Sequence, residues 1–276
     1  MKILITGGSG RIGKPVVEYL AGQQKYELWF LQRNNSHSTG YNTIQLDLIN
    51  ESQPIPKQIA AIKFDAIIHM AGITHMKDTK ELGEKNIAIN KNFLKFLRVA
   101  NGDSPLIFFS SVDVYGITNQ NFPLDIKSKC TPSSYYGRSK LFSEELFTKN
   151  LSKVYNLRIA PMIANEGEKD YLKRVYLPGT RIKFQSPYAR ENSFSDIKSI
   201  CQAINSCLEG STESTINVTD GKIYTENDFL KGSDFSLKIP KFFLNLVFNT
   251  LRRIDTPFSY RIEHKFHKLF KTNTYA

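Results

Sequence analysis

The sequence is poor in cysteine and has no long apolar run. Its three cysteines, Cys130, Cys201 and Cys207, are scattered along 276 residues. An odd and sparse set argues against a disulfide framework and a zinc site, and it is typical of a protein in a reducing cytoplasm. No stretch of about 18 apolar residues occurs, so we expect no membrane-spanning helix. The apolar run that opens the chain stops at Gly7 and is too short to predict a signal peptide.

Acidic residues are also in deficit. Lys and Arg number 37 against 26 Asp and Glu, which gives a net charge of +11. This balance suits an anionic ligand, an anionic membrane surface or nucleic acid. The chain contains no motif of a nucleic-acid-binding module, so we expect no nucleic-acid partner. Hydrophobic residues make up 41% of the chain, enough for the core of one large domain, alone or with a smaller lobe.

What is present is an alternation of short β-branched runs and helical periodicity. Strands are predicted at residues 2–6, 27–32, 42–48, 64–72, 105–111 and 156–162, and helices at 11–22, 84–100 and 133–151. Such alternation implies parallel pairing with right-handed crossovers, and therefore an α/β, doubly wound sheet. One more strand and turn is predicted at 216–221.

The pattern loosens after about residue 163. We expect residues 1–162 to form a dinucleotide-binding domain, to which residues 193–221 return. Residues 163–192 and 222–276 are basic, aromatic and irregular, and we expect them to form a smaller C-terminal substrate-binding lobe.

A glycine-rich segment, "TGGSGRIG" at residues 6–13, joins the first predicted strand to the first predicted helix. In this context each glycine has a task, either in the tight turn, in close approach to a pyrophosphate, or in helix–strand packing. The amides at the helix N-terminus then face the phosphates. The cofactor contacts predicted from this loop are Gly7, Gly10, Arg11, Ile12 and Gly13.

The end of the second predicted strand bears on the choice of cofactor. An acid there would bind the adenine ribose of NAD, but residues 31–34 read Leu-Gln-Arg-Asn. Arg33 can instead pair with a 2′-phosphate, with help from Arg11, so NADP is favoured over NAD. The alternative is that both arginines are solvated surface. Asp47 is the predicted acceptor for the adenine amino group.

Tyr136 and Lys140 lie four residues apart in the third predicted helix. That spacing places both side chains on one face. A phenol beside an ammonium ionises more easily than its reference pKa of about 10 implies, which prepares it for proton transfer near neutral pH. For this pattern alone, an exposed helix face with an aromatic and a basic residue is the alternative.

Seven motifs together resemble the extended short-chain dehydrogenase/reductases of the nucleotide-sugar epimerase/dehydratase group. They are "TGGSGRIG" at 6–13, "DL" at 47–48, "HMAG" at 69–72, "NIAINKNFL" at 86–94, "SSVDVYG" at 110–116, "YGRSK" at 136–140 and "INVTDG" at 216–221. The resemblance covers roughly the first 220 residues and implies a Rossmann-type fold with NAD or NADP. It adds Leu48, Ala71, Gly72 and Lys140 to the expected cofactor contacts.

The resemblance also implies catalytic roles. Tyr136 would be the acid/base, Lys140 would hold the nicotinamide ribose and lower the pKa of Tyr136, and Ser111 would hydrogen-bond the reacting oxygen. Asn86 matches the helix asparagine of the family, although a local polar contact explains it equally well. Tyr135 does not match the acid/base position, because the residue four positions after it is a serine.

Two departures from the family pattern bear on the reaction. The dehydratases carry an acidic pair where this chain has Val112-Asp113, which disfavours dehydration. Many epimerases carry an asparagine that binds the substrate diphosphate where this chain has Pro161. Arg181 and Arg190 are the expected substitutes, although each taken singly is also compatible with solvated surface.

Epimerase and 4-keto-sugar reductase share all of these motifs. A 4-epimerase acting through a keto intermediate is the first interpretation, and an NADPH-dependent reductase, which the absent acid favours, is the second. A non-catalytic dinucleotide-binding module is disfavoured by the intact Ser111, Tyr136 and Lys140. The expected partner is a sugar diphosphate carried by a nucleotide or a lipid, and a homodimer remains open.

A last pattern lies in "IPKFFLNLVFNTLRRI" at residues 239–254. Apolar residues follow a helical stripe there: Phe242, Phe243, Leu246, Val247, Thr250, Leu251 and Ile254. The stripe packs inward in one interpretation. In the other, a basic amphipathic helix attaches a cytoplasmic enzyme to the inner face of the membrane.

Overall fold

The computed structural model describes two compact units of the chain. The described residues are 1–33, 40–74, 77–100, 103–116, 122–163, 183–185, 190–225, 228, 236–238, 240–253 and 272–276. The first unit comprises Met1–Ser111, Tyr135–Arg158 and Ile200–Ile216, and the second comprises Val112–Ser134, Ile159–Ser199 and Asn217–Ala276. The predicted boundaries between a dinucleotide domain and a substrate lobe remain a prediction.

A seven-stranded sheet has the strand order β3-β2-β1-β4-β5-β6-β9. Its strands are β1 (Lys2–Thr6), β2 (Glu27–Gln32), β3 (Asn42–Gln45), β4 (Ala66–His69), β5 (Leu106–Ser111), β6 (Val154–Ile159) and β9 (Thr215–Val218). The pairings β1–β2, β2–β3, β1–β4 and β4–β5 are all parallel. The order reverses between β1 and β4, which confirms the predicted doubly wound, Rossmann-type sheet.

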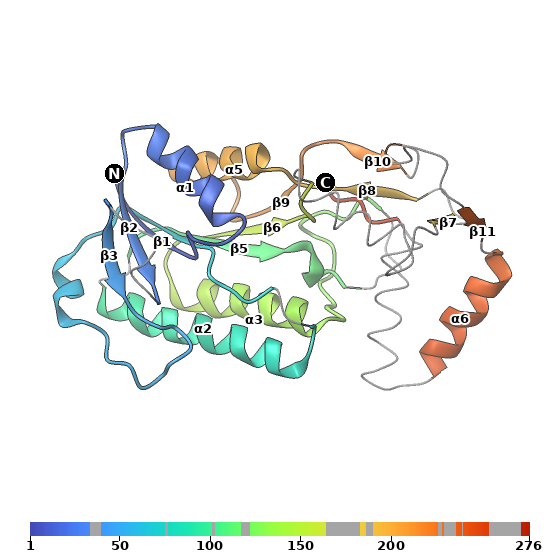
Figure 1. Cartoon of the computed structure of the whole chain (residues 1–276), viewed down its shortest axis with the longest axis horizontal. Helices are drawn as coiled ribbons and strands as arrows, with labels where there is room; N and C mark the ends of the chain where they lie inside the picture. Colours follow the sequence, from blue (N-terminus) through green and yellow to red (C-terminus); the bar gives the residue numbers. More distant parts are fainter. Residues whose placement is uncertain are drawn as a thin grey trace. The chain divides into compact units, whose positions relative to one another are not determined.

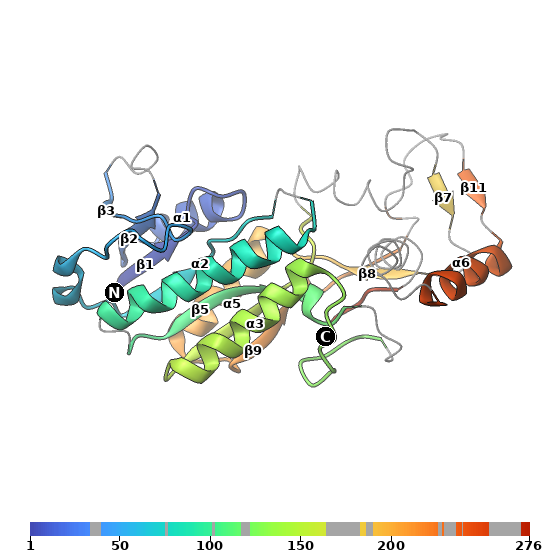
Figure 2. The same cartoon turned by 90° about the horizontal axis from the view of Figure 1, so that it is seen from below.

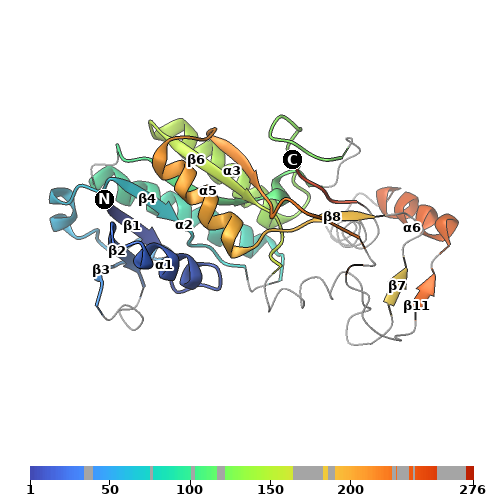
Figure 3. The same cartoon turned by 90° about the horizontal axis from the view of Figure 1, so that it is seen from above.

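Helices cover both faces of this sheet (Figure 1). On one face lie α2 (Lys80–Val99) and α3 (Tyr135–Asn150), side by side in Figure 2. On the other lie α1 (Gly13–Gly22) and α5 (Ile197–Glu209), seen together in Figure 3. Asn205 of α5 donates from Nδ2 to the Tyr19 hydroxyl of α1 at 2.5 Å. No helix was predicted at α5.

The core under α2 and α3 is aromatic. Phe93 and Phe96 of α2, Phe108 of β5 and Phe147 of α3 are fully buried. The rings of Phe108 and Phe147 meet edge to face, with centroids 5.1 Å apart. These rings fix the two helices against the sheet and so fix the surroundings of β5.

Several element boundaries shift by a few residues from the prediction. The helix predicted from residue 84 begins at Lys80, because Thr79 caps it by accepting at Oγ1 from Leu82 N at 3.3 Å. The strand predicted within residues 64–72, running into a small-residue turn, ends at His69. Beyond it, the amide of Ala71 donates to the Thr6 hydroxyl rather than to a backbone carbonyl of β1.

The second unit is built from short elements. They include the 3₁₀ helix η3 (Val112–Val114), the strands β7 (Lys183–Gln185), β8 (Glu191–Ser193), β10 (Ile223–Thr225) and β11 (Ser236–Lys238), and the helix α6 (Lys241–Arg253). The first unit adds a 3₁₀ helix, η2 (Lys57–Ala61). Strand β8 pairs antiparallel with β10, and β7 pairs parallel with β11. Within the described ranges, the structure has no helix long and apolar enough to cross a membrane.

The buried residues of helix α6, Leu244 and Phe248, lie outside the predicted stripe. Within the stripe, Phe242, Phe243 and Leu246 are 72%, 50% and 54% exposed. Inward packing of these three side chains is therefore wrong. Ile254 lies outside the described residues.

Candidate active site

The loop between β1 and α1 has no room for side chains at two of its glycines. Gly7 has φ of 71°, and a Cβ added to it would lie 2.6 Å from the amide nitrogen of Ala71. A Cβ on Gly13 would lie 2.1 Å from the carbonyl oxygen of Gly7. The loop therefore closes on itself and on the segment after β4, at the point where the strand order reverses. Bare backbone beside a helix N-terminus is what a pyrophosphate requires.

The start of α1 favours an anion. The helix begins at Gly13 and has no acidic residue in its first turn. Its macrodipole therefore places uncancelled partial positive charge at the loop. The predicted contacts Gly10, Arg11 and Ile12 belong to this loop, with Ile12 at the helix N-cap. The glycines and the helix terminus thus fit a dinucleotide.

The residues predicted to bind the adenosine half of the cofactor lie at the ends of β2 and β3. Arg33 follows β2 with an exposed side chain, and its carbonyl accepts from Gln45 Nε2 of β3 at 3.4 Å. Asp47 follows β3 and accepts at Oδ1 from the amide of Ile49 at 3.0 Å. Leu48 is buried beside it. The structure thus brings Arg33 and the segment of Asp47 to the same edge of the sheet.

A buried polar chain that the sequence reasoning missed connects four elements. The Thr6 hydroxyl donates to Nδ1 of His69 at 2.6 Å, and His69 Nε2 donates to Oδ1 of Asn90 at 2.7 Å. Asn90 in turn donates to Oγ of Ser143 at 2.8 Å. Burial lowers the pKa of His69 to about 3, so the ring is neutral, in agreement with one donating and one accepting nitrogen. The signal was present in "HMAG", where His69 precedes the two small residues.

Asn86 makes the local polar contact that the sequence left open. Its Oδ1 accepts from the amide of Ile73 at 2.8 Å, and its Nδ2 donates to the Ile73 carbonyl at 3.1 Å. These bonds hold the segment after β4, where a Cβ on Gly72 would lie 3.7 Å from Lys140 Nζ. The predicted cofactor segment and the predicted catalytic lysine are therefore neighbours.

The first turn of α3 is anchored from a distant part of the sequence. Asp78 accepts from the amide of Tyr136 at 2.9 Å and from that of Tyr135 at 3.3 Å. A Cβ on Gly83 of α2 would lie 3.2 Å from the Tyr135 carbonyl, so the two helices are in close contact there. A carboxylate at this helix N-terminus also opposes the positive end of its dipole.

Lys140 lies one turn after Tyr136 and is buried. Its Nζ is 5.7 Å from the centre of the Tyr136 ring and donates to the Phe109 carbonyl of β5 at 2.6 Å. Burial lowers the pKa of Lys140 to about 8, and the negative charge of Glu144 partly opposes this. Ser111, the last residue of β5, stands two residues beyond Phe109. The structure thus brings Tyr136 and Lys140 together on one helix, against the end of β5.

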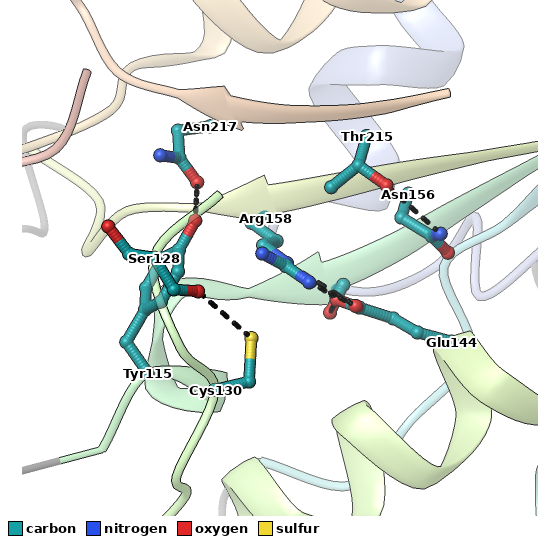
Figure 4. A network of polar contacts seen from close by, with 9 residues as sticks. Tyr115, Ser128, Cys130, Glu144, Asn156, Arg158, Thr215 and Asn217 are labelled. Atoms are coloured by element: carbon teal, nitrogen blue, oxygen red, sulfur yellow. Dashed lines mark hydrogen bonds and ion pairs between the residues drawn. The ribbon is translucent and has the colours of Figure 1, made fainter. Parts of the chain in front are cut away.

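A buried ion pair lies one turn further along α3. Glu144 accepts from Arg158 of β6, with Nη2 to Oε2 at 2.7 Å and Nε to Oε1 at 3.1 Å (Figure 4). The hydroxyl of Ser110 also donates to Oε1 of Glu144. No local sequence pattern indicates this pair, because its members lie on different elements.

The predicted substrate arginines belong elsewhere in the chain. Arg190 precedes β8 in the second unit and is buried, whereas Arg181 lies outside the described residues. Pro161, at the family's asparagine position, accepts at its carbonyl from the amide of Ser195 at 2.9 Å. Among the residues that the structure describes, no group of His, Cys, Asp and Glu could hold a metal ion.

A parallel sheet whose order reverses beside a glycine loop at a helix N-terminus is the fold of a dinucleotide-binding protein. The chain belongs to the NAD dependent epimerase/dehydratase family, whose model matches residues 3–168. It is 28% identical over 162 residues to UDP-glucose 4-epimerase 2 of Oryza sativa subsp. japonica, a match that covers 52% of this chain and 39% of that protein. The chain spans less than half the length of the first curated relatives it matches.

Solved structures share the fold at lower identity. The UDP-N-acetylglucosamine 4-epimerase from Bacillus cereus superposes with a TM-score of 0.62 at 20% identity, covering 83% of this chain and 79% of that one. The UDP-glucuronic acid 4-epimerase from Bacillus cereus in complex with NAD superposes with a TM-score of 0.63 at 18% identity, covering 86% and 87%.

Proposed function

We propose that the protein is an NAD(P)-dependent nucleotide-sugar 4-epimerase, or one that acts on a lipid-diphosphate sugar, working through a keto intermediate. The observation that carries this proposal is the 3.7 Å between Lys140 Nζ and the Cβ position of Gly72, because a lysine that holds the nicotinamide ribose must lie beside the bound cofactor. The name of the rice relative, a UDP-glucose 4-epimerase, supports the reaction and the nucleotide carrier.

The chain's own residues divide the work. Tyr136 takes the proton from the sugar hydroxyl and later returns it, while Ser111 hydrogen-bonds the same oxygen. Lys140 holds the nicotinamide ribose, and its charge favours the phenolate of Tyr136. Asn86 positions the loop at Ile73 through its two hydrogen bonds. The dinucleotide, when bound, supplies reversible hydride transfer.

The glycine loop and the strand ends hold the cofactor in this proposal. The contacts are Gly7, Gly10, Arg11, Ile12, Gly13, Arg33, Asp47, Leu48, Ala71, Gly72 and Lys140. We infer that NADP binds at least as tightly as NAD, because Arg33 stands where an acid would bind the ribose of NAD. Fluorescence titration of NADPH and NADH against the chain and Arg33→Ala tests this. A preference for NADPH that Arg33→Ala abolishes is expected, and an unchanged preference would contradict the role of Arg33.

A 4-keto-sugar reductase is the second candidate, and the same Arg33 favours it. An epimerase returns the cofactor to its starting state, so it can retain the dinucleotide through many turnovers, whereas a reductase must exchange it. Mass spectrometry of the small molecules released when the purified protein is denatured separates the two. A stoichiometric retained dinucleotide supports the epimerase, and its absence together with consumption of added NADPH supports the reductase.

The substrate diphosphate is assigned to Arg190 and Arg181. A planar guanidinium can bind a diphosphate through two parallel hydrogen bonds, which supports the part of Arg190. Arg190→Lys should raise KM for a nucleotide sugar more than it lowers kcat, because Lys lacks the planar fork of Arg. A fall in kcat at constant KM would contradict this assignment.

The features of helix α6 support a peripheral contact with an anionic membrane. The side chains of Phe242, Phe243 and Leu246 are exposed, and the helix carries Lys241, Arg252 and Arg253 without any acid. An apolar surface on a wholly basic helix is complementary to anionic headgroups over acyl chains.

A homodimer stays a prediction, which light scattering can test by measuring the molar mass in solution.

Co-sedimentation with anionic and with neutral vesicles tests this contact. Binding to anionic vesicles alone is expected, with loss at ~0.5 M salt, which shortens the screening length to a few Å. Phe242→Ser with Leu246→Ser should abolish it, whereas Ile223→Ser, which alters a 51% exposed residue on β10, should not. Equal loss in both variants, or a change of molar mass in the first, would contradict a membrane surface.

A further inference from the structure

The ion pair of Glu144 and Arg158 is more closely held than a surface pair. The two side chains are only 6% and 9% exposed, and the guanidinium reaches both carboxylate oxygens. Ser110 is a second residue that donates to the carboxylate. Figure 4 shows the guanidinium of Arg158, from β6, directed at the carboxylate of Glu144, from α3.

This pair meets β5 at Ser110, the residue that follows the one contacted by Lys140. Phe109 accepts from Lys140 through its carbonyl, and the next residue, Ser110, donates to Glu144. The residue after that is Ser111, the proposed partner of the reacting oxygen. Lys140 and Glu144 are one helical turn apart, so their side chains share a face of α3. The hydrogen bonds of Phe109 and Ser110, two consecutive residues of β5, therefore fix the position of α3 along the end of that strand.

The groups that act on Lys140 in the described part of the chain are few. On α3 they are Tyr136 and Glu144. On β4 the ring of His69 is neutral, because burial lowers its pKa to about 3. Arg158 of β6 forms the ion pair with Glu144. Strand β5 contributes the Phe109 carbonyl and the Phe108 ring, whose centre is 4.8 Å from Nζ. Glu144 is the anion among them whose charge counters the burial of the amine.

We propose that Glu144, held by Arg158 and Ser110, is a positioning residue: it anchors α3 to β5 and β6, so that Lys140 stays at the Phe109 carbonyl beside Tyr136, and its charge, one helical turn away, favours the charged amine. The inference rests on the proposed function only for the use made of Lys140. Arg158 has a second effect, since it shares the charge of Glu144 and limits how strongly that charge acts on the lysine.

Stability alone does not explain such a pair. Replacing a buried ion pair by apolar residues is often neutral or stabilising, whereas removal of one partner strands a buried charge. The double variant Glu144→Met with Arg158→Met should therefore remain folded. This variant therefore separates the effect of the Glu144 charge on Lys140 from the effect of the ion pair on the stability of the protein.

The titration of Lys140 measures the effect without cofactor or turnover. Full-length protein is labelled with ¹³C-lysine, and the Lys140 signal is assigned by its loss in Lys140→Met. The titration midpoint should fall by about 1 pH unit in Glu144→Gln, as expected for loss of a nearby opposite charge. It should fall by less in the Met/Met variant. Glu145→Gln, which alters the exposed neighbouring residue on α3, should leave the midpoint unchanged.

An unchanged midpoint in folded Glu144→Gln, or a midpoint that rises in the folded Met/Met variant, would overturn the inference. A second readout separates it from the proposed function. If Lys140 assists catalysis as its charged form, the alkaline limb of kcat/KM should move to lower pH together with the midpoint. A midpoint that moves while the alkaline limb stays would uphold the role of Glu144 and contradict the catalytic role of Lys140.

Discussion

Two adjacent tyrosines open α3, and the structure gives them different surroundings. Tyr135 lies against Gly83 of α2, and its ring is 5.6 Å from the guanidinium carbon of Arg138. The ring of Tyr136 is on the side of Lys140, 5.7 Å from its Nζ. Helical spacing makes this difference readable from the sequence, because a lysine follows Tyr136 by four residues and a serine follows Tyr135.

Tyr136→Phe should lower turnover by about 100-fold or more, the order expected for loss of a general acid/base. Cofactor affinity, measured by fluorescence titration, should barely change, since the backbone of the site is untouched. Tyr135→Phe is the matched control and should have little effect. Equal loss in the two variants would contradict the assignment of Tyr136.

Burial of the Lys140 amine should appear in the pH dependence of stability. Its pKa is about 8 in the folded protein against 10.5 for the ordinary side chain. Below pH 8 both states bind the proton, and the folded protein bears the full cost of a buried charge. As pH rises from 8 to 10.5, the folded state loses the proton first, so stability gained through this group increases with pH.

Urea unfolding of the wild type and Lys140→Met at several pH values checks this prediction. Relative to the variant, the free energy of unfolding of the wild type should increase by up to about 3 kcal/mol between pH 8 and 10.5, at 1.36 kcal/mol for each pKa unit. Subtraction of the variant cancels the other lysines and tyrosines. A constant difference across this range would show that Lys140 titrates as an ordinary lysine.

Other residues of the site could not be predicted from the sequence. Glu144 and Arg158 lie on different elements, and Asp78 is 57 and 58 residues away from the amides it caps. Such pairs depend on the packing of α3 against β5, β6 and the segment before α2. Sequence periodicity describes one element at a time and cannot supply them.

At the scale of elements, the sheet was readable because its strands are buried β-branched runs between turn residues. The strands β1 and β2 match their predicted bounds. Helix α5 was missed although Ile200, Ile204 and Cys207 recur at helical spacing and are buried. The strands β7, β8, β10 and β11 have three residues each, too few to show a period.

The N-terminus of α3 should depend on Asp78. Asp78→Ala removes two backbone hydrogen bonds to a carboxylate, so the free energy of unfolding should fall by about 1 kcal/mol. Asp78→Asn should recover part of this loss. Urea unfolding measures both, with Asp103→Ala, an exposed residue outside the helices, as the control. No loss in Asp78→Ala beyond that control would show that the cap is not needed.

At the scale of the whole molecule, the family match and the basic helix α6 lie in different parts of the chain. The family model covers residues 3–168, which contain the glycine loop and the tyrosine–lysine pair. The basic helix α6 lies beyond this range. The first unit therefore contains the residues proposed for the reaction, whereas Arg190 and α6, proposed for the substrate diphosphate and the membrane contact, belong to the second unit.

A 4-epimerase of the kind proposed would invert a sugar carbon without net oxidation. The most direct measurement is proton NMR of UDP-glucose and UDP-N-acetylglucosamine incubated with the protein and catalytic NAD or NADP, with the absorbance of the reduced cofactor followed in parallel. We expect the 4-epimer to appear over many turnovers while reduced cofactor does not accumulate, and we expect Tyr136→Phe to lower the rate of epimer formation by about 100-fold or more. Product that forms only in proportion to added NADPH, or an unchanged spectrum with every sugar and cofactor, would contradict it.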